Sequence, residues 1–562
     1  MLRRVCFVIF VLIVLISHFG ECEENVESDT FYEVDINDVD DQWPIRFGVK
    51  FWDWGPKRYK KIIKSLGPVF NTGHWPTLWE VSSSAPAPWE ADDERMDMWV
   101  KSIYRNLQDK KTTMRETSEI HRNASIQVIG KFLGVPEAYS LAYQQKEYRA
   151  KKKAEEEGKE YDESVYYYNT LDWDRRDDLA KFFASSVNIS TSFGTSLPYI
   201  EMIDRPAIAS KEELYVAPEQ YTYLVKKTRE ELDARGLTED KVKIMCPGVD
   251  YPGQLRPYLK KLAEDKEAYD KLHAITTHIP DNGGSLLDVQ HMAEKLRDDI
   301  KNILPSDWEP KRVVVSEFFY NGTDDIEVDG MRFNGNIYKC YDDKYQRTGH
   351  MILKDCLAQT PWYAVRMLAG LTIQLSHGLP WVVYNQGADQ WWERTCDGLI
   401  DRDERPKQIL AAFESLLPYL TNETYPIRKQ WKNTDDCYIS AFKSVKSKLR
   451  VVVAVTNFSP KVCERSFSLR GIDLWDIQKS RIITYNNGTV SITANKPYRA
   501  LLTEKLLNYD VYDVEDGVKT GPEIEFDLTV GPYASATAII DAKAPKRKKK
   551  TNNKEKSDHT EL

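Results

Sequence analysis

The run Val313-Val314-Val315-Ser316-Glu317 is a short β-branched segment that ends in a carboxylate. Seven other apolar runs of similar length resemble it, and longer amphipathic stretches separate them, which is typical of alternating strands and helices. The eight predicted strands span residues 46–51, 68–71, 126–133, 198–203, 242–246, 274–278, 312–317 and 381–384. Eight such units without an internal repeat predict a closed (β/α)8 TIM barrel, of the α/β class. An open doubly wound sheet is the alternative, but Trp52-Asp53-Trp54-Gly55-Pro56 after the first run is not the Gly-rich turn of that fold.

Further patterns divide the chain into segments. Helices are expected at 56–66, 218–235, 286–303 and 357–375, and the Lys- and Glu-rich stretch 144–168 is interpreted as a solvated helical excursion. After residue 420 only strand and turn signals remain, at 437–442, 449–457, 480–485, 489–492, 499–503 and 534–540, which predicts a C-terminal β-sandwich. The predicted boundaries are an acidic N-terminal segment at 23–42, the barrel at 43–428, the sandwich at 429–543 and a basic disordered tail at 544–562. Within the acidic segment, Phe31-Tyr32-Glu33-Val34 is a candidate extra strand.

The composition excludes several classes of protein. Of the 562 residues 41% are hydrophobic, 29% charged and 12% aromatic, which argues against a disordered, collagen-like or polytopic membrane chain. The net charge is −9 and the densest basic run is confined to the tail, so we expect no nucleic-acid partner. The 15 Trp and 31 Tyr indicate sugars or peptides as ligands instead.

Both ends of the chain indicate the secretory pathway. Residues 1–22 have two arginines, twelve apolar residues and a small polar end, which is typical of a signal peptide and too short for a membrane span. The end His559-Thr560-Glu561-Leu562 resembles a KDEL-type signal, which a retrieval receptor would bind. We therefore expect the endoplasmic reticulum lumen, with secretion as the alternative. Six cysteines remain after cleavage, among which Cys437 and Cys463 are the first choice for a disulfide, and N-glycosylation sequons begin at Asn123, Asn188, Asn321, Asn422, Asn457 and Asn487.

Carboxylates at strand ends are the candidate catalytic groups. Hydrolysis of a glycosidic bond needs two carboxyl groups that flank it, and Glu317 is placed to be the attacking one. The alternative for Glu317 is a structural ion pair. Glu201 and Asp204 are three positions apart, so only one of them points into the barrel unless the strand ends before Asp204. Arg205 beside Asp204 would keep that carboxylate ionised and make it a poor proton donor.

Arg205, together with polar and aromatic residues of the sixth and eighth predicted strands, supplies the candidate substrate contacts. A sugar needs donors and acceptors for its hydroxyls and an indole for its apolar face. The candidates are Arg205, His278, Trp381, Asn385, Trp391 and Trp392. We expect neither a metal nor another cofactor, because no ligand spacing such as His-x-x-x-His or Cys-x-x-Cys is present. A serine-hydrolase elbow is also absent from the sequence.

In this order the strand ends resemble clan A glycoside hydrolases. The similar segments are strand four with Glu201, strand six ending in His278, Ser316-Glu317-Phe318 and strand eight beginning at Trp381, together with Gly398-Leu399-Ile400-Asp401. The resemblance covers the barrel and extends to the accessory β-sandwich. It implies that Glu317 is the nucleophile of a retaining mechanism and that His278 and Trp381 line the neighbouring subsite.

The chain departs from this family at the proton donor. Asp204 stands where the clan has Asn, and Arg205 stands where it has the acid/base Glu. A guanidinium cannot release a proton near neutral pH, so the donor is either displaced to Asp204 or Glu201, or missing. Two functions follow: a glycosidase acting on a polysaccharide or glycan in the secretory pathway, or a catalytically inactive barrel that binds carbohydrate.

Overall fold

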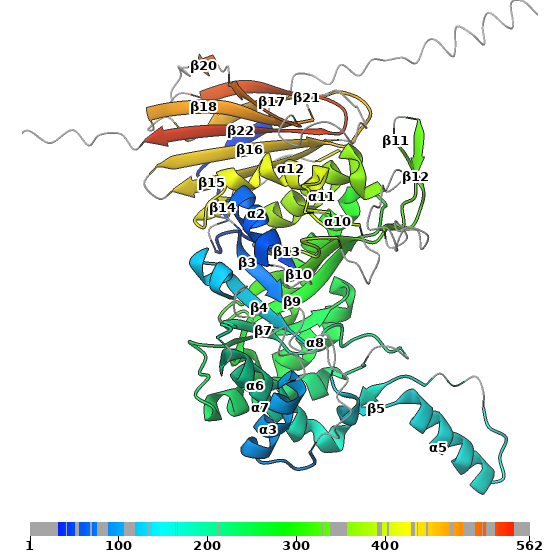
Figure 1. Ribbon diagram of the computed structural model, residues 1–562. Helices are drawn as coiled ribbons and strands as arrows, with labels where there is room; N and C mark the ends of the chain where they lie inside the picture. The colour runs from blue at the N-terminus through cyan, green and yellow to red at the C-terminus, as the bar shows by residue number, and fades with distance from the viewer. Residues whose placement is uncertain are drawn as a thin grey trace, which may run out of the picture.

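A computed structural model of the chain is shown in Figure 1. It describes residues 32–543 except 41, 51–55, 68–69, 76–87, 106–117, 133–134, 163–164, 166, 193, 211–213, 329, 338–356, 390–395, 402–403, 429–432, 435–436, 446–447, 473–475, 487–500, 508–509 and 513–522. The predicted signal peptide, the strand at 489–492, the tail at 544–562 and its retrieval signal lie outside the described residues.

Eight parallel strands close into a barrel, which confirms the predicted fold. Their order around the barrel follows the chain, and the last strand pairs with the first. The strands are β2 (Arg46–Lys50), β3 (Phe70–Trp75), β4 (Gln127–Lys131), β7 (Tyr199–Glu201), β8 (Lys243–Val249), β9 (Leu272–Asp281), β10 (Arg312–Tyr320) and β13 (Trp381–Tyr384). Each overlaps one of the eight apolar runs in the sequence.

Helices follow the strands and cover the barrel. They are α2 (Pro56–Leu66), α3 (Asp93–Arg105), α6 (Arg176–Ser192), α7 (Pro218–Ala234), α8 (Pro252–Glu264), α9 (Lys266–Asp270), α10 (Leu286–Ile303), α11 (Pro361–Ser376) and α12 (Gln408–Glu414). Local sequence fixes several starts: Ser285 caps α10 by accepting a hydrogen bond from the Leu287 amide, and Thr360 caps α11 by accepting one from Tyr363. The charged helix α5 (Tyr143–Glu156) extends away from the barrel in Figure 1. None of the described helices is long and apolar enough to cross a bilayer.

The C-terminal region is a sandwich of two sheets. One sheet has the order β14 (Thr424–Pro426), β15 (Cys437–Val445), β16 (Leu449–Asn457), β22 (Ala534–Lys543), β18 (Asp476–Tyr485) and β19 (Leu502–Leu506). The other has the order β1 (Tyr32–Asp35), β17 (Cys463–Arg470), β21 (Glu523–Val530) and β20 (Asp510–Tyr512). Two small antiparallel sheets complete the strands: β5 (Ser140–Leu141) with β6 (Thr170–Leu171), and the hairpin of β11 (Ile326–Val328) with β12 (Met331–Phe333).

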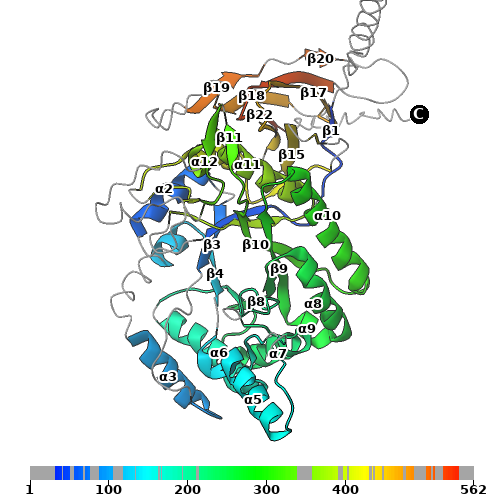
Figure 2. The same cartoon turned by 90° about the vertical axis from the view of Figure 1, so that its right-hand side faces the viewer.

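The sandwich packs on one side of the barrel through α11 and α12, as Figure 2 shows. The faces of α11 are buried almost throughout because this helix lies between the barrel and the six-stranded sheet. A disulfide between Cys437 and Cys463 joins the two sheets and confirms the predicted pairing. The predicted extra strand is also confirmed, since β1 pairs in parallel with β17.

One of the predicted sequons does not fit glycosylation of the folded chain. Asn457 is completely buried, and its side-chain amide donates hydrogen bonds to the carbonyls of Lys461, Val530 and Gly531. A glycan on this nitrogen would remove these bonds and has no space in the core.

Candidate active site

Side chains that point into the barrel form successive layers along its axis. Successive residues of a strand alternate between the interior and the surrounding helices, so every second residue belongs to the interior. The middle layer is apolar and contains Ile129, Met245, Ala274, Val314 and Val383. The layer at the carboxyl ends of the strands is polar and contains Lys50, Lys131, Glu201, His278 and Glu317. This layer brings the predicted carboxylates together.

A β-bulge turns Glu317 into the barrel. Val314 faces the interior, and strict alternation would direct Ser316 inward and Glu317 outward. The pairing of β10 with β9 shifts between Val315 and Glu317, so one additional residue enters the strand there. Glu317 then pairs with His278 and its side chain meets the two lysines of the polar layer.

The ammonium of Lys131 occupies the centre of this layer. Its Nζ lies 2.7 Å from Glu317 Oε1, 3.3 Å from Glu201 Oε1 and 3.0 Å from His278 Nε2, and it forms an ion pair with Asp204. Burial by itself lowers the pKa of Lys131, but Asp204, Glu201 and Glu317 outweigh it and raise the pKa above the ordinary lysine value. Lys131 is therefore a permanent cation at neutral pH.

A second lysine contacts the same oxygen of Glu317. Lys50, the last residue of β2, donates to Glu317 Oε1 at 2.5 Å and is 2% exposed. Burial lowers the pKa of Lys50, and the attraction of Glu317 offsets only part of this effect. Glu317 thus carries two charge-assisted hydrogen bonds on one oxygen, and both withdraw electron density from this carboxylate.

The turn after β7 places Asp204 and Arg205 at the mouth of the barrel. Arg205 has a φ of 49°, in the left-handed region, and its amide donates to the carbonyl of Gly248. The Asp204 side chain is 6% exposed and points toward Lys131, whereas the Arg205 side chain is 40% exposed. Arg205 Nε lies 3.6 Å from Asp204 Oδ2. The strand ends at Glu201, so both carboxylates reach the interior although they are three positions apart.

The side chain of Glu201 fits only because Gly248 lies beside it. A Cβ at Gly248 would lie 2.3 Å from Glu201 Oε1, and the φ of 67° at this glycine also disfavours other residues. Glu201 is completely buried.

Three groups in this layer have the geometry of a metal site. The ligand atoms of Glu201, Asp204 and His278 lie within 4.8 Å of one another. All three contact Lys131 Nζ, so the ammonium takes the place that a divalent cation would need. His278 Nδ1 lies 3.4 Å from Asp250 Oδ1 on its other side.

The remaining predicted contacts are dispersed. Asn385 follows β13 at the carboxyl end, and its Oδ1 is buried without a hydrogen-bond partner among the described residues. Trp381 is the first residue of β13, so it lies completely buried at the amino end of the barrel, away from the carboxylates. Trp391 and Trp392 lie outside the described residues.

Sequence reasoning overlooked Lys50 and Lys131. The signal that could have found them is the alternation of their strands, because Ile129 faces inward and Lys131 is two positions later. Gly48 and Lys50 have the same spacing in β2.

Similarity to known proteins is confined to structure. No protein-family model matches the sequence, and no curated protein matches it. Among solved structures, a glycoside hydrolase family 30 endoxylanase from Clostridium papyrosolvens aligns with a TM-score of 0.54 at 11% identity, over 92% of this chain and 100% of the other. The family 30 subfamily 8 xylanase Xyn30A from Clostridium acetobutylicum aligns with a TM-score of 0.56 at 12% identity, over 91% and 100%. The endo-β1,6-glucanase BT3312 gives 0.52 at 12% identity, over 91% and 93%.

The chain has a glycoside hydrolase fold. This fold places the strand-seven carboxylate Glu317 and the strand-four turn with Asp204 and Arg205 at one mouth, in agreement with the predicted barrel and sandwich. Asp204 Oδ1 and Glu317 Oε1 bind the same nitrogen, so they are no farther apart than two hydrogen-bond lengths. This upper limit for the two oxygens does not exceed the roughly 5 to 5.5 Å between the carboxyl groups of a retaining pair. In this glycoside hydrolase fold, however, a lysine ammonium lies between them.

Proposed function

We propose that this chain is a catalytically inactive barrel that binds carbohydrate. The observation that carries the proposal is the Lys131 ammonium, which bonds to Glu317 and Asp204 at once. A retaining hydrolase needs one carboxylate free to attack and one carboxylic acid ready to donate a proton. Lys131 pairs with both carboxylates and Arg205 also lies beside Asp204, so neither requirement is met by the described groups.

The glycan would bind at the same mouth. The structural neighbours named above include two xylanases and an endo-β1,6-glucanase, whose names denote activity on polysaccharides. The half-exposed guanidinium of Arg205 can bind a carboxylate of an acidic sugar, and the buried Oδ1 of Asn385 can accept from a hydroxyl. An acidic polysaccharide is therefore the proposed ligand class at this mouth.

A retaining hydrolase with Glu317 as nucleophile is the second candidate. The short separation between Asp204 and Glu317 favours it. In this mechanism a substrate would have to displace Lys131 from at least one carboxylate before reaction, because the ammonium lies between the two oxygens that act on the glycosidic bond.

Covalent trapping distinguishes the two candidates. The purified protein is incubated with a panel of activated 2-deoxy-2-fluoro glycosides, and the peptide containing Glu317 is examined by mass spectrometry. We expect no adduct on Glu317, whereas a fluoroglycosyl adduct there would establish the hydrolase and refute the inactive barrel. Glu317→Gln should keep glycan binding on a polysaccharide array near the wild-type level.

Arg205→Glu tests the missing acid. The substitution restores a carboxylate beside Pro206, and Arg205→Gln is the matched control because it removes the cation without adding an acid. Hydrolysis gained by Arg205→Glu and not by Arg205→Gln would support an inactive barrel that lost its donor. Wild-type hydrolysis that both substitutions abolish would contradict the proposal.

We also propose that the protein resides in the lumen of the endoplasmic reticulum. The support is the sequence of the two ends, 1–22 and 559–562. Deletion of the last four residues should send the protein into the culture medium, and a scrambled tetrapeptide is the control. Complete secretion of the intact chain would contradict retention.

A further inference from the structure

The amino end of the barrel collects cations around aromatic rings. The first residues of β2, β8 and β10 are Arg46, Lys243 and Arg312, and Trp381 is the first residue of β13. Arg46 Cζ lies 4.9 Å and Arg312 Cζ lies 5.6 Å from the centroid of the Trp381 ring. Arg312 Cζ also lies 4.7 Å from the ring of Trp43.

These cations have no carboxylate partner among the described residues. Arg46 donates hydrogen bonds to Gln127 and Tyr199, and Lys243 lies over the Tyr199 ring. Both partners are neutral groups. Arg312 is only 8% exposed, and its Nε has no hydrogen-bond partner among the described residues. A buried guanidinium without a counter-charge is costly, because burial removes its hydration and no acid replaces it.

The titration behaviour of neighbouring groups reflects the same excess of positive charge. Burial and the nearby Arg46 lower the pKa of Arg312 to about 10. Burial, Lys243, Arg312, Arg46 and Lys311 lower the pKa of His273 to about 3.

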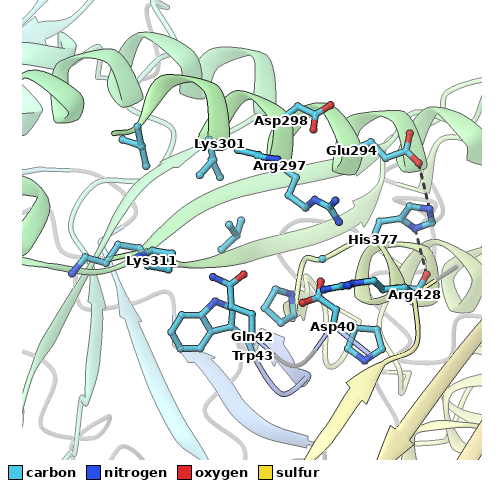
Figure 3. Close-up of a pocket in the computed structure, with 18 of the residues that line it drawn as sticks. Asp40, Gln42, Trp43, Glu294, Arg297, Asp298, Lys301, Lys311, His377 and Arg428 are labelled. Atoms are coloured by element: carbon cyan, nitrogen blue, oxygen red, sulfur yellow. Dashed lines mark hydrogen bonds and ion pairs between the residues drawn. The ribbon is translucent and has the colours of Figure 1, made fainter. Parts of the chain in front are cut away.

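A large cavity borders this end of the barrel. Its volume is about 1260 Å³, and Trp43 and Lys311 line one end of it. Figure 3 shows Arg297 above Trp43 in the middle of the cavity and His377, Glu294 and Arg428 at the opposite end. The half-buried ring of Trp308 is a further aromatic surface in the lining. The cavity is large enough for an oligosaccharide-sized ligand.

We propose that the amino end of the barrel is a second binding site, for the sulfate or phosphate group of a ligand whose remainder lies in this cavity. Arg46, Lys243 and Arg312 would bind the tetrahedral oxyanion, and Lys311 would add a fourth cation at the junction with the cavity. A guanidinium binds two oxygens of such a group through parallel hydrogen bonds. Trp43 lies over Arg312 and lines the cavity, so it connects the oxyanion site with the space for the rest of the ligand. This site is separate from the carboxylate mouth and does not depend on the proposed function.

The test measures binding of inorganic phosphate and inorganic sulfate to the full chain. Thermal unfolding is followed in either anion and in sodium chloride of the same ionic strength, and titration calorimetry gives the dissociation constant. Because phosphate and sulfate stabilise folded proteins in general, we expect their rise in Tm over chloride to be larger for the wild type than for Arg312→Met. The variant Arg312→Met should weaken binding at least about tenfold, the loss typical of one charge-assisted bidentate contact. Arg332→Gln is the control, because Arg332 is an exposed arginine in the distant hairpin β11–β12.

A structural role alone would give a different result. If Arg312 only stabilises the barrel, Arg312→Met lowers the Tm equally in chloride and in phosphate, which would overturn the proposal. In our proposal, Arg312→Met loses the specific response to phosphate and is no less stable than wild type in chloride, because an uncompensated buried charge has been removed. Arg46→Gln is a second variant that should also weaken phosphate binding if Arg312→Met does not fold. A wild-type protein with equal Tm in all three salts would also refute the site.

A sulfated hexasaccharide and its unsulfated counterpart test whether the ligand that bears the oxyanion is a sugar. Only the sulfated sugar should bind, and inorganic sulfate should compete with it. Binding of the sulfated sugar that neither sulfate nor Arg312→Met affects would contradict a shared site.

Discussion

At the carboxyl end of the barrel Lys50 and Lys131 lie against carboxylates, whereas at the amino end Arg46 and Arg312 lie against the indole of Trp381. Both layers are buried and both contain cations, but among the described residues only at the carboxyl end do carboxylates of the chain pair with these cations. At the carboxyl end the chain's own carboxylates therefore balance the charge of the buried lysines. The opposite end keeps an excess of positive charge that an external anion can balance.

The largest effect is expected from Lys131→Ala, which removes the cation of the carboxyl end. Glu201, Asp204 and Glu317 would then be buried together without their common counter-ion, and breaking such a pair costs about 3–5 kcal/mol. Urea unfolding at pH 7 measures the loss. Lys261→Ala, in the exposed pair with Glu264, is the control and should change stability by less than about 1 kcal/mol.

The same variant should acquire a metal site. The ligand atoms of Glu201, Asp204 and His278 converge within 4.8 Å, and Lys131→Ala leaves room for a divalent ion among them. Millimolar Zn²⁺ should restore part of the lost Tm in Lys131→Ala. Lys131→Met fills the space with an apolar chain and should show no such recovery; equal recovery in both variants would show that zinc binds elsewhere.

Trp381→Phe tests the amino end and should cost about 1–3 kcal/mol. The smaller ring leaves a cavity and weakens the contact with both Arg46 and Arg312. The free energy of unfolding should fall more in chloride than in phosphate, because a bound oxyanion would compensate the guanidinium groups. An equal loss of unfolding free energy in both salts would show that the contacts of Trp381 with the arginines do not depend on a bound anion.

Lys50→Met should lower the free energy of unfolding less than Lys131→Ala or Trp381→Phe does, by under about 1.5 kcal/mol at neutral pH. Burial lowers the pKa of Lys50, so keeping this ammonium charged already costs free energy, and Glu317 retains Lys131 as its partner. Urea unfolding of both lysine variants provides the comparison. A loss as large as that of Lys131→Ala would show that Glu317 depends on both cations.

The smallest effect concerns His273 and is seen only as a pH dependence. The pKa of His273 is about 3 in the folded chain and about 6.5 when unfolded, so the unfolded state binds more protons between these values. The contribution of His273 is therefore fully present above pH 6.5 and is lost as the pH falls toward 3. His273→Phe should reduce the slope of Tm against pH in this window, and an unchanged slope would assign it to other groups.

The strands of the barrel could be predicted from sequence because β-branched runs and amphipathic stretches alternate clearly. The strand β17 was missed, since Cys463–Arg470 interleaves polar residues on its exposed face, and β21 was missed although Ile524, Phe526 and Leu528 alternate with acids and threonine. Glu317 and Asp204 could be found as carboxylates at strand ends. The ion pairs with Lys131 could not, because the bulge in β10 and the turn after β7 set which side chains meet.

Trp381 shows the limit of reasoning by resemblance. The similarity to clan A implies a subsite residue, but alternation from the start of β13 places this indole at the amino end of the barrel. Its neighbours Arg46 and Arg312 are first residues of their own strands, a pattern visible only when strand starts are compared.

The pairing of β1 with β17 has a consequence for biosynthesis. Tyr32 lies opposite Phe467, so more than 400 residues separate two neighbouring strands. At about 5–20 residues per second, a ribosome needs on the order of 20 to 90 s to make the partner of β1 after β1 itself has emerged. During this interval Val34 and Ile36, both fully buried in the finished sandwich, have no strand to cover them. The barrel can form earlier from its consecutive units, while the N-terminal strand stays available to chaperones until the last domain is synthesised.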